Sequence, residues 1–461
     1  MLLARALRLS PPSGERSALI AFVGAGGKTT GMFQLARELP PPVLVTTTTH
    51  LGPWQASLAD QHIYAESTGD IERLAPRGVT LVSGPVQGDR LKGVTEDVLL
   101  WLRACAKEQG FPLLVEADGA RQKPLKSPNE HEPAVPGFAD RVIVVAGLSG
   151  LGKPLSEEYV HRPQFFSTLS GLPLNAPITA DGLGRLLVHP EGGLKNIPAY
   201  AVRTVFLNQA DTPELQARGG EMSASLLEEF EAVVVGSLQQ SHFQTFERTA
   251  GIVLAAGGST RFGQPKQVLD WHGEPFVRAV AQTALRANLS PVIVVVGAYA
   301  QEVESALKDL PVVIVHNESW QSGQASSIRV GIAALTPVDP ASPRLPAMNG
   351  ARASLAGVRV GSAIFLLADQ PQITPGVIGA LVERHTRELD PIVAPLVMME
   401  RRANPVLFDR LTFSDLSQLK GDVGGRAIFS KFPVAYLPWH DDRLLLDVDK
   451  PEDYDRLKEM E

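Results

Sequence analysis

The chain has 461 residues, of which 44% are hydrophobic and 20% charged, and its formal net charge is −7 at pH 7. This length predicts two domains, and the acidic balance without a long basic run disfavours nucleic acid as a partner. The single cysteine, Cys105, excludes disulfides within the chain and cysteine-rich metal sites. Residues 1–10 lack a secretion-type apolar core, and no apolar run reaches the ~18 residues of a membrane span. We therefore expect a cytoplasmic enzyme that acts on small molecules and has no membrane partner.

The first half of the chain alternates short apolar runs with amphipathic stretches. Residues 17–39 predict a buried strand, a tight glycine turn and a helix. Further strand-like runs follow, and one of the helical stretches between them is residues 95–109; the runs are residues 41–51, 79–84, 111–120, 140–148, 201–211 and 230–238. Such alternation is typical of parallel βαβ units.

The same rhythm restarts after residue 249. Residues 239–249 are polar without a clear period, so we place a linker there and predict domains at residues 1–245 and 246–461. Strands and helices are predicted at residues 250–258, 275–289, 290–299, 310–317, 326–335 and 362–375. Residues 336–361, rich in Pro, Ala and Gly, predict a long surface loop. The fold class expected is α/β, with two doubly wound domains: a P-loop-like one first and a Rossmann-like one second.

A glycine-rich loop opens the first predicted helix and reads Gly-Ala-Gly-Gly-Lys-Thr-Thr. It is a shortened Walker A motif, because Phe22 stands where a full motif has glycine. Small residues let backbone N–H groups face phosphate oxygens, while a lysine supplies charge and a threonine hydroxyl can bind Mg²⁺. An ordinary glycine turn is the alternative. The predicted nucleotide-binding residues are Gly24, Gly26, Gly27, Lys28, Thr29 and Thr30.

Two carboxylates end the strand predicted at residues 111–120. Glu116 and Asp118 would lie beside the nucleotide crevice and hold Mg²⁺ or polarise a water, unless Asp118 only begins a turn. The next loop carries four basic side chains, which form either an anion clamp or a solvated loop: Arg121, Lys123, Lys126 and His131.

Several of these stretches resemble one family. The sequences VGAGGKTT, TTTTH, EADGARQKPLKSPNEHEP, GLSGLGKPLSEEYVHR and LNQAD are similar to those of YqeC-type proteins, across most of residues 15–240. The resemblance implies a P-loop-like accessory domain linked to maturation of selenium-dependent molybdenum hydroxylases. It does not define a reaction.

A second glycine-bearing loop, LAAGGSTRFGQPK, spans residues 254–266. Lys266 follows a proline and precedes Gln267, so this is not a Walker A motif. A long loop of this kind can wrap a triphosphate with N–H groups, while Arg261 and Lys266 neutralise the phosphates and a leaving pyrophosphate. A polar loop with two exposed cations is the alternative. The predicted nucleotide-binding residues are Leu254, Ala255, Ala256, Gly257, Gly258, Ser259 and Gly263.

Carboxylates for a metal ion come from two distant segments. Asp369 ends an apolar strand and is predicted to bind Mg²⁺. Asp447 and Asp449 precede a helix that starts with proline; we assign Asp447 to capping that helix and Asp449 to the metal, although either role fits both. Ser326 and Ser327, at another helix start, are predicted to bind nucleotide, with capping as the alternative.

The second half resembles the MocA-type molybdenum cofactor cytidylyltransferases. Six stretches carry the resemblance in the family's order: LAAGGSTRFGQPK, NESWQSGQASSIRVG, LLADQPQIT, RRANPVLF, GDVGGR and DVDKPEDY. It implies CTP and Mg²⁺, transfer of CMP to the terminal phosphate of molybdopterin cofactor, and release of pyrophosphate. It also implies that Asn404, Asp422 and Arg426 face the pterin. Ala403 departs from the glycine usual in this family.

Three further expectations concern specificity and role. Related guanylyltransferases tend to have Leu-Ala-Gly-Gly and Asp-Lys, where this chain has Leu-Ala-Ala-Gly and Pro-Lys, so the resemblance favours CTP over GTP. A sugar or isoprenoid nucleotidyltransferase is an alternative on the same fold. Another is a carrier and insertion chaperone, with a molybdenum hydroxylase as the partner.

Overall fold

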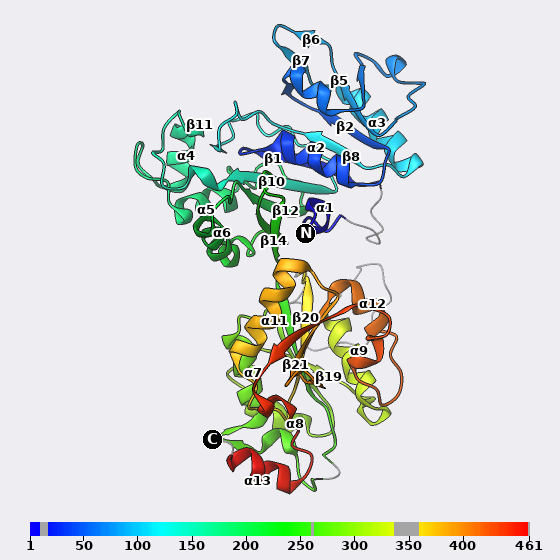
Figure 1. Cartoon of the computed structure of the whole chain (residues 1–461), viewed down its shortest axis with the longest axis vertical. Coiled ribbons are helices and arrows are strands. Elements are labelled where there is room, and N and C mark those ends of the chain that lie inside the picture. The colour runs from blue at the N-terminus through cyan, green and yellow to red at the C-terminus, as the bar shows by residue number, and fades with distance from the viewer. Residues whose placement is uncertain (10–16, 260–261, 336–358, 460–461) are drawn as a thin grey trace. The chain divides into compact units, whose positions relative to one another are not determined.

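The chain folds into two α/β units. The computed structural model describes residues 1–9, 17–259, 262–335 and 359–459. The two compact units are Met1–Phe246 and Glu247–Glu461 (Figure 1). Within the described ranges, no helix is long and apolar enough to cross a membrane.

The first unit is built on a nine-stranded sheet in the order β14-β13-β12-β10-β1-β8-β2-β5-β4. Every neighbouring pair is parallel except β13 with β14. The strands are β1 (Leu19–Gly24), β2 (Val43–Thr47), β4 (Gln61–Tyr64), β5 (Val79–Ser83), β8 (Leu113–Glu116), β10 (Arg141–Gly147), β12 (Val202–Asn208), β13 (Ala232–Ser237) and β14 (His242–Phe246). Their nearly continuous apolar runs are explained by burial of both sheet faces.

Helices cover both faces of this sheet. On β1, Leu19 and Val23 face one core while Ile20 and Phe22 face the other, as strand alternation requires. Helices α1 (Leu3–Ala6) and α2 (Lys28–Glu38) pack on the second face. The first face is covered by α3 (Glu96–Gln109), α4 (Pro163–Ser170), α5 (Ala180–Val188) and α6 (Pro213–Leu226).

Two small sheets accompany the large one. One pairs β9 (Leu125–Lys126) with β11 (Val160–His161), and the other joins β3 (His50–Leu51), β6 (Val86–Gln87) and β7 (Arg90–Lys92). The chain that leaves β8 continues into β9, so the pair β9–β11 belongs to the surroundings of the glycine-lysine loop described below.

The second unit has a mixed sheet in the order β19-β18-β15-β20-β23-β21-β22, with β24 also paired to β21. Strands β15, β18, β19 and β20 are parallel, while β23 runs antiparallel to β20 and β21. Their bounds are β15 (Thr249–Ala255), β18 (Val292–Val296), β19 (Val313–His316), β20 (Ser362–Leu367), β21 (Ile392–Val397), β22 (Arg401–Arg402), β23 (Val406–Asp409) and β24 (Val434–Trp439). The prediction of two α/β domains is confirmed.

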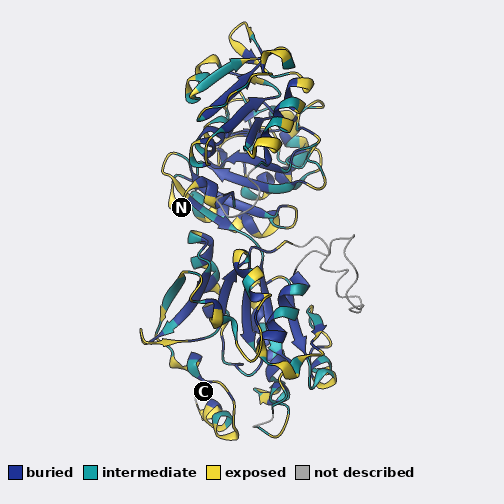
Figure 2. Cartoon of the chain, turned by 90° about the vertical axis from the view of Figure 1, so that its right-hand side faces the viewer, coloured by how far each residue is buried: buried dark blue, intermediate teal, exposed yellow. Residues whose placement is uncertain are grey.

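Two cores again lie on opposite faces of the sheet, visible as buried strands in Figure 2. Helices α7 (Phe276–Arg286), α8 (Ala300–Ala306) and α11 (Pro375–Glu388) pack on one face, and α9 (Gln324–Leu335) and α12 (Phe413–Leu416) on the other. The hairpin of β16 (Asp270–Trp271) and β17 (Glu274–Pro275) leads into α7. A small separate core under α13 (Pro451–Glu459) includes Phe276, Val448 and Leu457.

The linker predicted at residues 239–249 is largely structured. Residues His242–Phe246 form β14, antiparallel to β13, with Phe243 and Thr245 buried. A single short strand among polar residues shows too little alternation of apolar and polar side chains to be recognised from the sequence. The loop predicted at residues 336–361 lies outside the described residues up to position 358.

Candidate functional site

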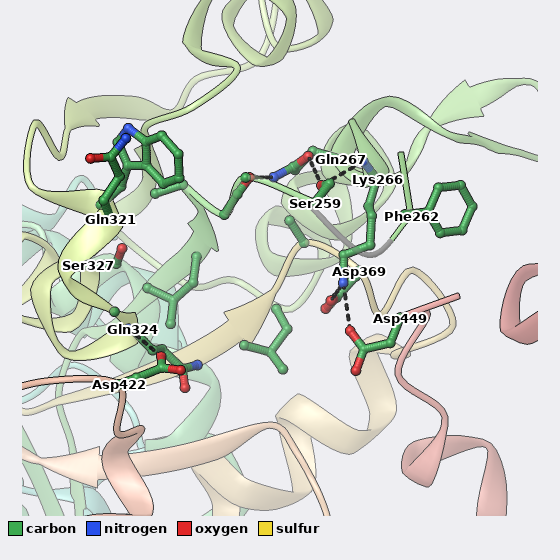
Figure 3. Close-up of a pocket in the computed structure, with 18 of the residues that line it drawn as sticks. Ser259, Phe262, Lys266, Gln267, Gln321, Gln324, Ser327, Asp369, Asp422 and Asp449 are labelled. Atoms are coloured by element: carbon green, nitrogen blue, oxygen red, sulfur yellow. Dashed lines mark hydrogen bonds and ion pairs between the residues drawn. The ribbon is translucent and has the colours of Figure 1, made fainter. Parts of the chain in front are cut away.

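A cavity in the second unit has a volume of about 590 Å³. It lies where β15 and β20 end, the place where parallel α/β sheets bind ligands. Figure 3 shows Lys266, Asp369 and Asp449 on one side, and Gln324 and Asp422 on the other. Five segments line it: Leu254, Ala256, Gly257, Gly258, Ser259, Phe262, Lys266 and Gln267; Trp320, Gln321, Ser322, Gly323, Gln324 and Ser327; Leu367, Ala368 and Asp369; Asp422; and Asp449.

A lysine lies between two carboxylates in this cavity. Lys266 Nζ donates to Asp369 Oδ2 at 2.7 Å and to Asp449 Oδ1 at 2.9 Å (Figure 3). Burial alone would lower the pKa of Lys266, but the two carboxylates outweigh burial and raise it. The ammonium therefore stays charged at neutral pH, and three predicted residues that are far apart in sequence meet here.

The loop before Lys266 is held by hydrogen bonds. Ser259 Oγ accepts from the Lys266 backbone N–H at 3.1 Å and donates to Gln267 Oε1 at 3.2 Å. Gln267 Nε2 in turn donates to Gly257 O at 2.7 Å, and its side chain is buried. Gln267 was absent from the predicted set, and its only sequence signal was its place directly after Lys266.

Two glutamines fix the segment that carries Asp449. Gln370 Nε2 donates to Asp447 Oδ1 at 2.5 Å, and Gln372 Nε2 donates to Leu446 O at 2.7 Å. Both follow Asp369 closely, so the segments that carry Asp369 and Asp449 are tied together. Partial burial raises the pKa of Asp447 to about 6, and the charges of Asp369 and Asp449 add to the increase.

The capping role predicted for Asp447 is wrong. Helix α13 begins at Pro451, four positions beyond Asp447, too far for a cap. Asp453 Oδ2 accepts from the backbone N–H groups of Asp449 and Lys450 at 3.0 and 2.9 Å instead.

The opposite wall is formed by the start of α9 and the loop after α12. Asp422 Oδ1 accepts from the Gln324 backbone N–H at 3.2 Å, which places this predicted acceptor residue at the helix start. Asn317 Nδ2 donates to Ser326 Oγ and Ser327 Oγ at 2.7 and 2.9 Å. Ser327 lines the cavity, whereas Ser326 is buried behind it and donates to Gly323 O.

The remaining predicted residues divide into three groups. Arg426 Nη2 donates to Asn404 Oδ1 at 3.4 Å, which brings these two predicted acceptor residues together, and the positive charge of Arg426 lowers the pKa of Asp447. Ala255 is buried in the core and Gly263 lies off the cavity wall. Arg261 lies outside the described residues.

Two carboxylates that share one ammonium present hard oxygen ligands close together. Among described residues, no group of three or more His, Cys, Asp or Glu side chains is placed to hold a metal ion. Mg²⁺ commonly takes only one or two carboxylates and completes its shell with water and substrate phosphates. The pair Asp369 and Asp449 therefore fits a Mg²⁺ ion that binds together with a nucleotide.

The glycine-lysine loop of the first unit connects β1 to α2. Lys28 is only 4% exposed; its Nζ donates to Gly24 O at 2.7 Å and lies 3.2 Å from Asp118 Oδ1. Thr29 Oγ1 donates to Glu116 Oε2 at 2.6 Å. Burial raises the pKa of Glu116, although the charge of Lys28 opposes the increase. Lys28, Thr29, Glu116 and Asp118 are thus brought together, while Thr30 is exposed on α2.

The first half of this loop uses its N–H groups within the protein. Gly24 N donates to Asp118 Oδ2, Ala25 N to Val145 O and Gly26 N to Lys123 O, at 2.8 to 3.1 Å. The expectation that these groups face phosphate is therefore wrong for this structure. Asn208 Nδ2, outside the predicted set, donates to Gly26 O at 2.7 Å and holds the loop from β12. The start of α2, from Gly27, therefore remains the part of the loop that we predict to bind phosphate.

Together with the two folds, comparisons with known families define the class of protein: a YqeC-type α/β domain followed by a nucleotidyltransferase-type domain. A profile described as "MobA-like NTP transferase domain" matches residues 251–437. The profile "YqeC protein" matches residues 20–164. The chain is 33% identical over 236 residues to "Uncharacterized protein YqeC" of Escherichia coli, covering 49% of this chain and 90% of that protein. Through its first unit, the chain belongs to the YqeC family.

Two relatives resemble the second unit. "Nicotine blue oxidoreductase" of Paenarthrobacter nicotinovorans is 29% identical over 217 residues, which are 45% of this chain and 95% of that protein. A "Probable molybdenum cofactor guanylyltransferase" of Bacillus cereus is 36% identical over 64 residues, which are 14% of this chain and 32% of that protein. The resemblance to a nucleotidyltransferase domain is confirmed at this coarser level.

Proposed function

We propose that the second unit is a molybdenum cofactor cytidylyltransferase. An oxygen of the acceptor's terminal phosphate bonds to the α-phosphorus of CTP. The bond from that phosphorus to the oxygen bridging to the β-phosphate breaks, and pyrophosphate leaves with the electron pair. No protein nucleophile takes part, so the residues act through positioning and charge.

One observation carries this proposal: Lys266 bridges Asp369 and Asp449 inside a cavity of about 590 Å³. A fixed cation beside paired carboxylates suits triphosphate chemistry, because the lysine neutralises phosphate charge. We assign Lys266, and Arg261 by prediction alone, to the triphosphate. When bound, Mg²⁺ held by Asp369 and Asp449 would neutralise charge that develops on the phosphates.

The two walls of the cavity suggest two substrate sides. Gly257, Gly258 and Ser259 adjoin Lys266, so their backbone groups are assigned to the nucleotide phosphates. Ser327 and Gln321 line the opposite wall, and we assign them to the base of the nucleotide. We assign the acceptor to Asn404, Asp422 and Arg426, since Arg426 donates to Asn404 Oδ1 and Asp422 lines the cavity.

The choice of CTP rests on the loop sequence. Ala256 lines the cavity where related guanylyltransferases tend to have glycine. One relative is named a guanylyltransferase and another an oxidoreductase. We favour transfer over the oxidoreductase reaction because the lysine–carboxylate cluster is suited to phosphates.

For the first unit we propose an accessory nucleotide-binding role. The hydrogen bond from Thr29 to Glu116 joins the two groups that would share Mg²⁺ in a P-loop protein, and Lys28 lies beside them. This module would serve maturation of a molybdenum hydroxylase, which is the partner we propose. A chaperone role would then accompany the transfer reaction.

The test is a screen of CTP, GTP and ATP with and without molybdopterin cofactor, followed by pyrophosphate release. We expect release with CTP that requires both Mg²⁺ and the acceptor. Asp369→Asn should abolish it, while Lys308→Ala, which removes an exposed lysine that is not part of the cavity lining, should retain it. Release with a sugar phosphate as acceptor, or wild-type release by Asp369→Asn, would refute the assignment.

A further inference from the structure

The second glycine-bearing loop has all its carbonyls occupied between positions 254 and 259. Each of these six backbone oxygens accepts a hydrogen bond from another residue of the second unit. The bonds, in chain order, are Ala368 N to Leu254 O at 3.2 Å, Gln267 Nε2 to Ala255 O at 3.3 Å, Ala298 N to Ala256 O at 3.2 Å, Gln267 Nε2 to Gly257 O at 2.7 Å, Tyr299 Oη to Gly258 O at 3.2 Å and Phe262 N to Ser259 O at 3.0 Å. The carbonyl side of this stretch is therefore turned toward the protein.

The amides at the end of the same stretch are not used in this way. The N–H groups of Gly257, Gly258 and Ser259 donate to no other described residue, and all three residues line the cavity. Successive backbone N–H groups that are left free beside a cavity form a binding place for an anion. The loop therefore presents donors, and no free carbonyl acceptors, at these three positions.

The direction of each amide is set by the carbonyl before it. In a planar trans peptide, the C=O of one residue and the N–H of the next point in opposite directions. The bond from Gln267 to the carbonyl of Gly257 thus orients the N–H of Gly258. The bond from Tyr299 to the carbonyl of Gly258 orients the N–H of Ser259 in the same manner. Two side chains therefore control two of the three free donors.

Gln267 is itself held firmly. Its side chain is only 4% exposed, and its Nε2 donates to two loop carbonyls. Its Oε1 accepts from Ser259 Oγ, which accepts in turn from the backbone N–H of Lys266 (Figure 3). A buried amide with both ends bonded has little freedom to move. Gln267 therefore links the glycines of the loop to the peptide of the lysine that we assign to the triphosphate.

We propose that Gln267 and Tyr299 are positioning residues of the triphosphate site. By holding the carbonyls of Gly257 and Gly258 away from the ligand, they present the next two N–H groups to phosphate oxygens. Donors that are oriented before the ligand arrives bind charge without the cost of rearranging the loop. Tyr299 is not part of the cavity lining, so it acts only through the loop. This inference rests on the function proposed above and deepens it.

The test is hydrogen exchange of the full chain, followed by mass spectrometry, as CTP is titrated in the presence of Mg²⁺. Protection of the peptide that contains residues 254–259 reports binding at this loop alone. Tyr299→Phe should raise the CTP concentration at half-protection about threefold, and Gln267→Met, which removes two donations, about tenfold. Tyr200→Phe and Gln216→Met remove matching bonds to carbonyls of the first unit and should leave it unchanged.

Steady-state transfer gives a readout that a merely structural role would not move. For Tyr299→Phe, the KM for CTP should rise about threefold while kcat stays within about twofold of the wild type. The reason is that the loop amides hold the triphosphate equally before and during the reaction. A smaller fraction of folded protein would instead lower the apparent kcat and leave KM unchanged.

The possible results separate this inference from the function on which it rests. If CTP, GTP and pyrophosphate all fail to protect the loop peptide of the wild type, both are refuted. If CTP protects the wild type and half-protects Tyr299→Phe at the same concentration, the positioning role is refuted and the proposed function stands. Exchange of the β15 peptide in urea shows whether each variant is folded; should Gln267→Met not fold, Tyr299→Phe decides the question.

Discussion

The two glycine-bearing loops have similar composition but different surroundings. Lys28 is almost fully buried. Its ammonium donates to the carbonyl of Gly24 in its own loop and forms an ion pair with Asp118, so its charge is balanced inside the first unit. Lys266 bridges two carboxylates beside a wide cavity. A glycine turn followed by a lysine thus predicts a loop, but it does not predict which groups the lysine ammonium will contact.

The comparison also separates two uses of glycine. Gly26 lies against the backbone of Gly147 and Pro124, whereas Gly263 has no described atom within 4 Å of an added Cβ. The first loop is therefore packed against neighbouring segments at Gly26, whereas the second has open space at Gly263.

The largest effect is expected at Lys266. Lys266→Ala should reduce pyrophosphate release from CTP about 10³-fold, because a cation that stabilises charge in the transition state is lost. Lys308→Ala is the matched control. If Lys266→Ala released pyrophosphate at a rate within twofold of the wild type, the proposed role of Lys266 would be contradicted.

Alanine substitutions at glycines of the two loops should lower the free energy of unfolding by different amounts. Gly26→Ala places a Cβ 2.3 Å from Gly147 N at a φ of +80°, so we expect a loss of about 3 kcal/mol in the unfolding free energy. Gly263→Ala has the same φ but open space, and should cost about 1 kcal/mol. Hydrogen exchange of peptides from β1 and β15 in rising urea measures each unit separately; equal losses would contradict the packing difference.

Acid should weaken the first unit through Glu132. The pKa of this group is lowered to about 2 in the fold, so its stabilising contribution is complete above its ordinary value and lost as pH falls toward 2. Glu132→Gln should cost about 2 kcal/mol at pH 7, discounted for partial exposure, and progressively less below pH 4. Glu157→Gln, an exposed change nearby in sequence, should have no such pH dependence in urea unfolding.

The smallest expected effect tests whether the loops act separately. Thr29→Ala should lower the affinity of the first unit for Mg²⁺-nucleotide about tenfold, since one metal-directed hydroxyl is removed. Transfer by the second unit should be unchanged. Calorimetry with ATP and GTP, with Mg²⁺ and with EDTA, measures the first quantity; a parallel loss of transfer would mean that the loops serve one reaction.

Local sequence patterns predicted most of the fold. Continuous apolar runs such as residues 292–296 and helical stretches such as residues 276–286 show the periods of buried strands and amphipathic helices, and both elements formed there. The short strand β14 was missed because five residues with only two buried side chains carry little signal. The two domain types were recognisable because their motifs are contiguous.

The sequence by itself determined the strand–loop–helix units and the residue types at the end of each strand. Only the tertiary structure decided which of them meet. Lys266 reaches Asp369 across 103 positions and Asp449 across 183, and Gln370 ties Asp447 to the same place. The order of strands in the sheet sets these distances, whereas sequence periodicity reflects only neighbours along the chain. For the same reason, the inward use of the Gly24–Gly26 amides could not be read from the loop's own residues.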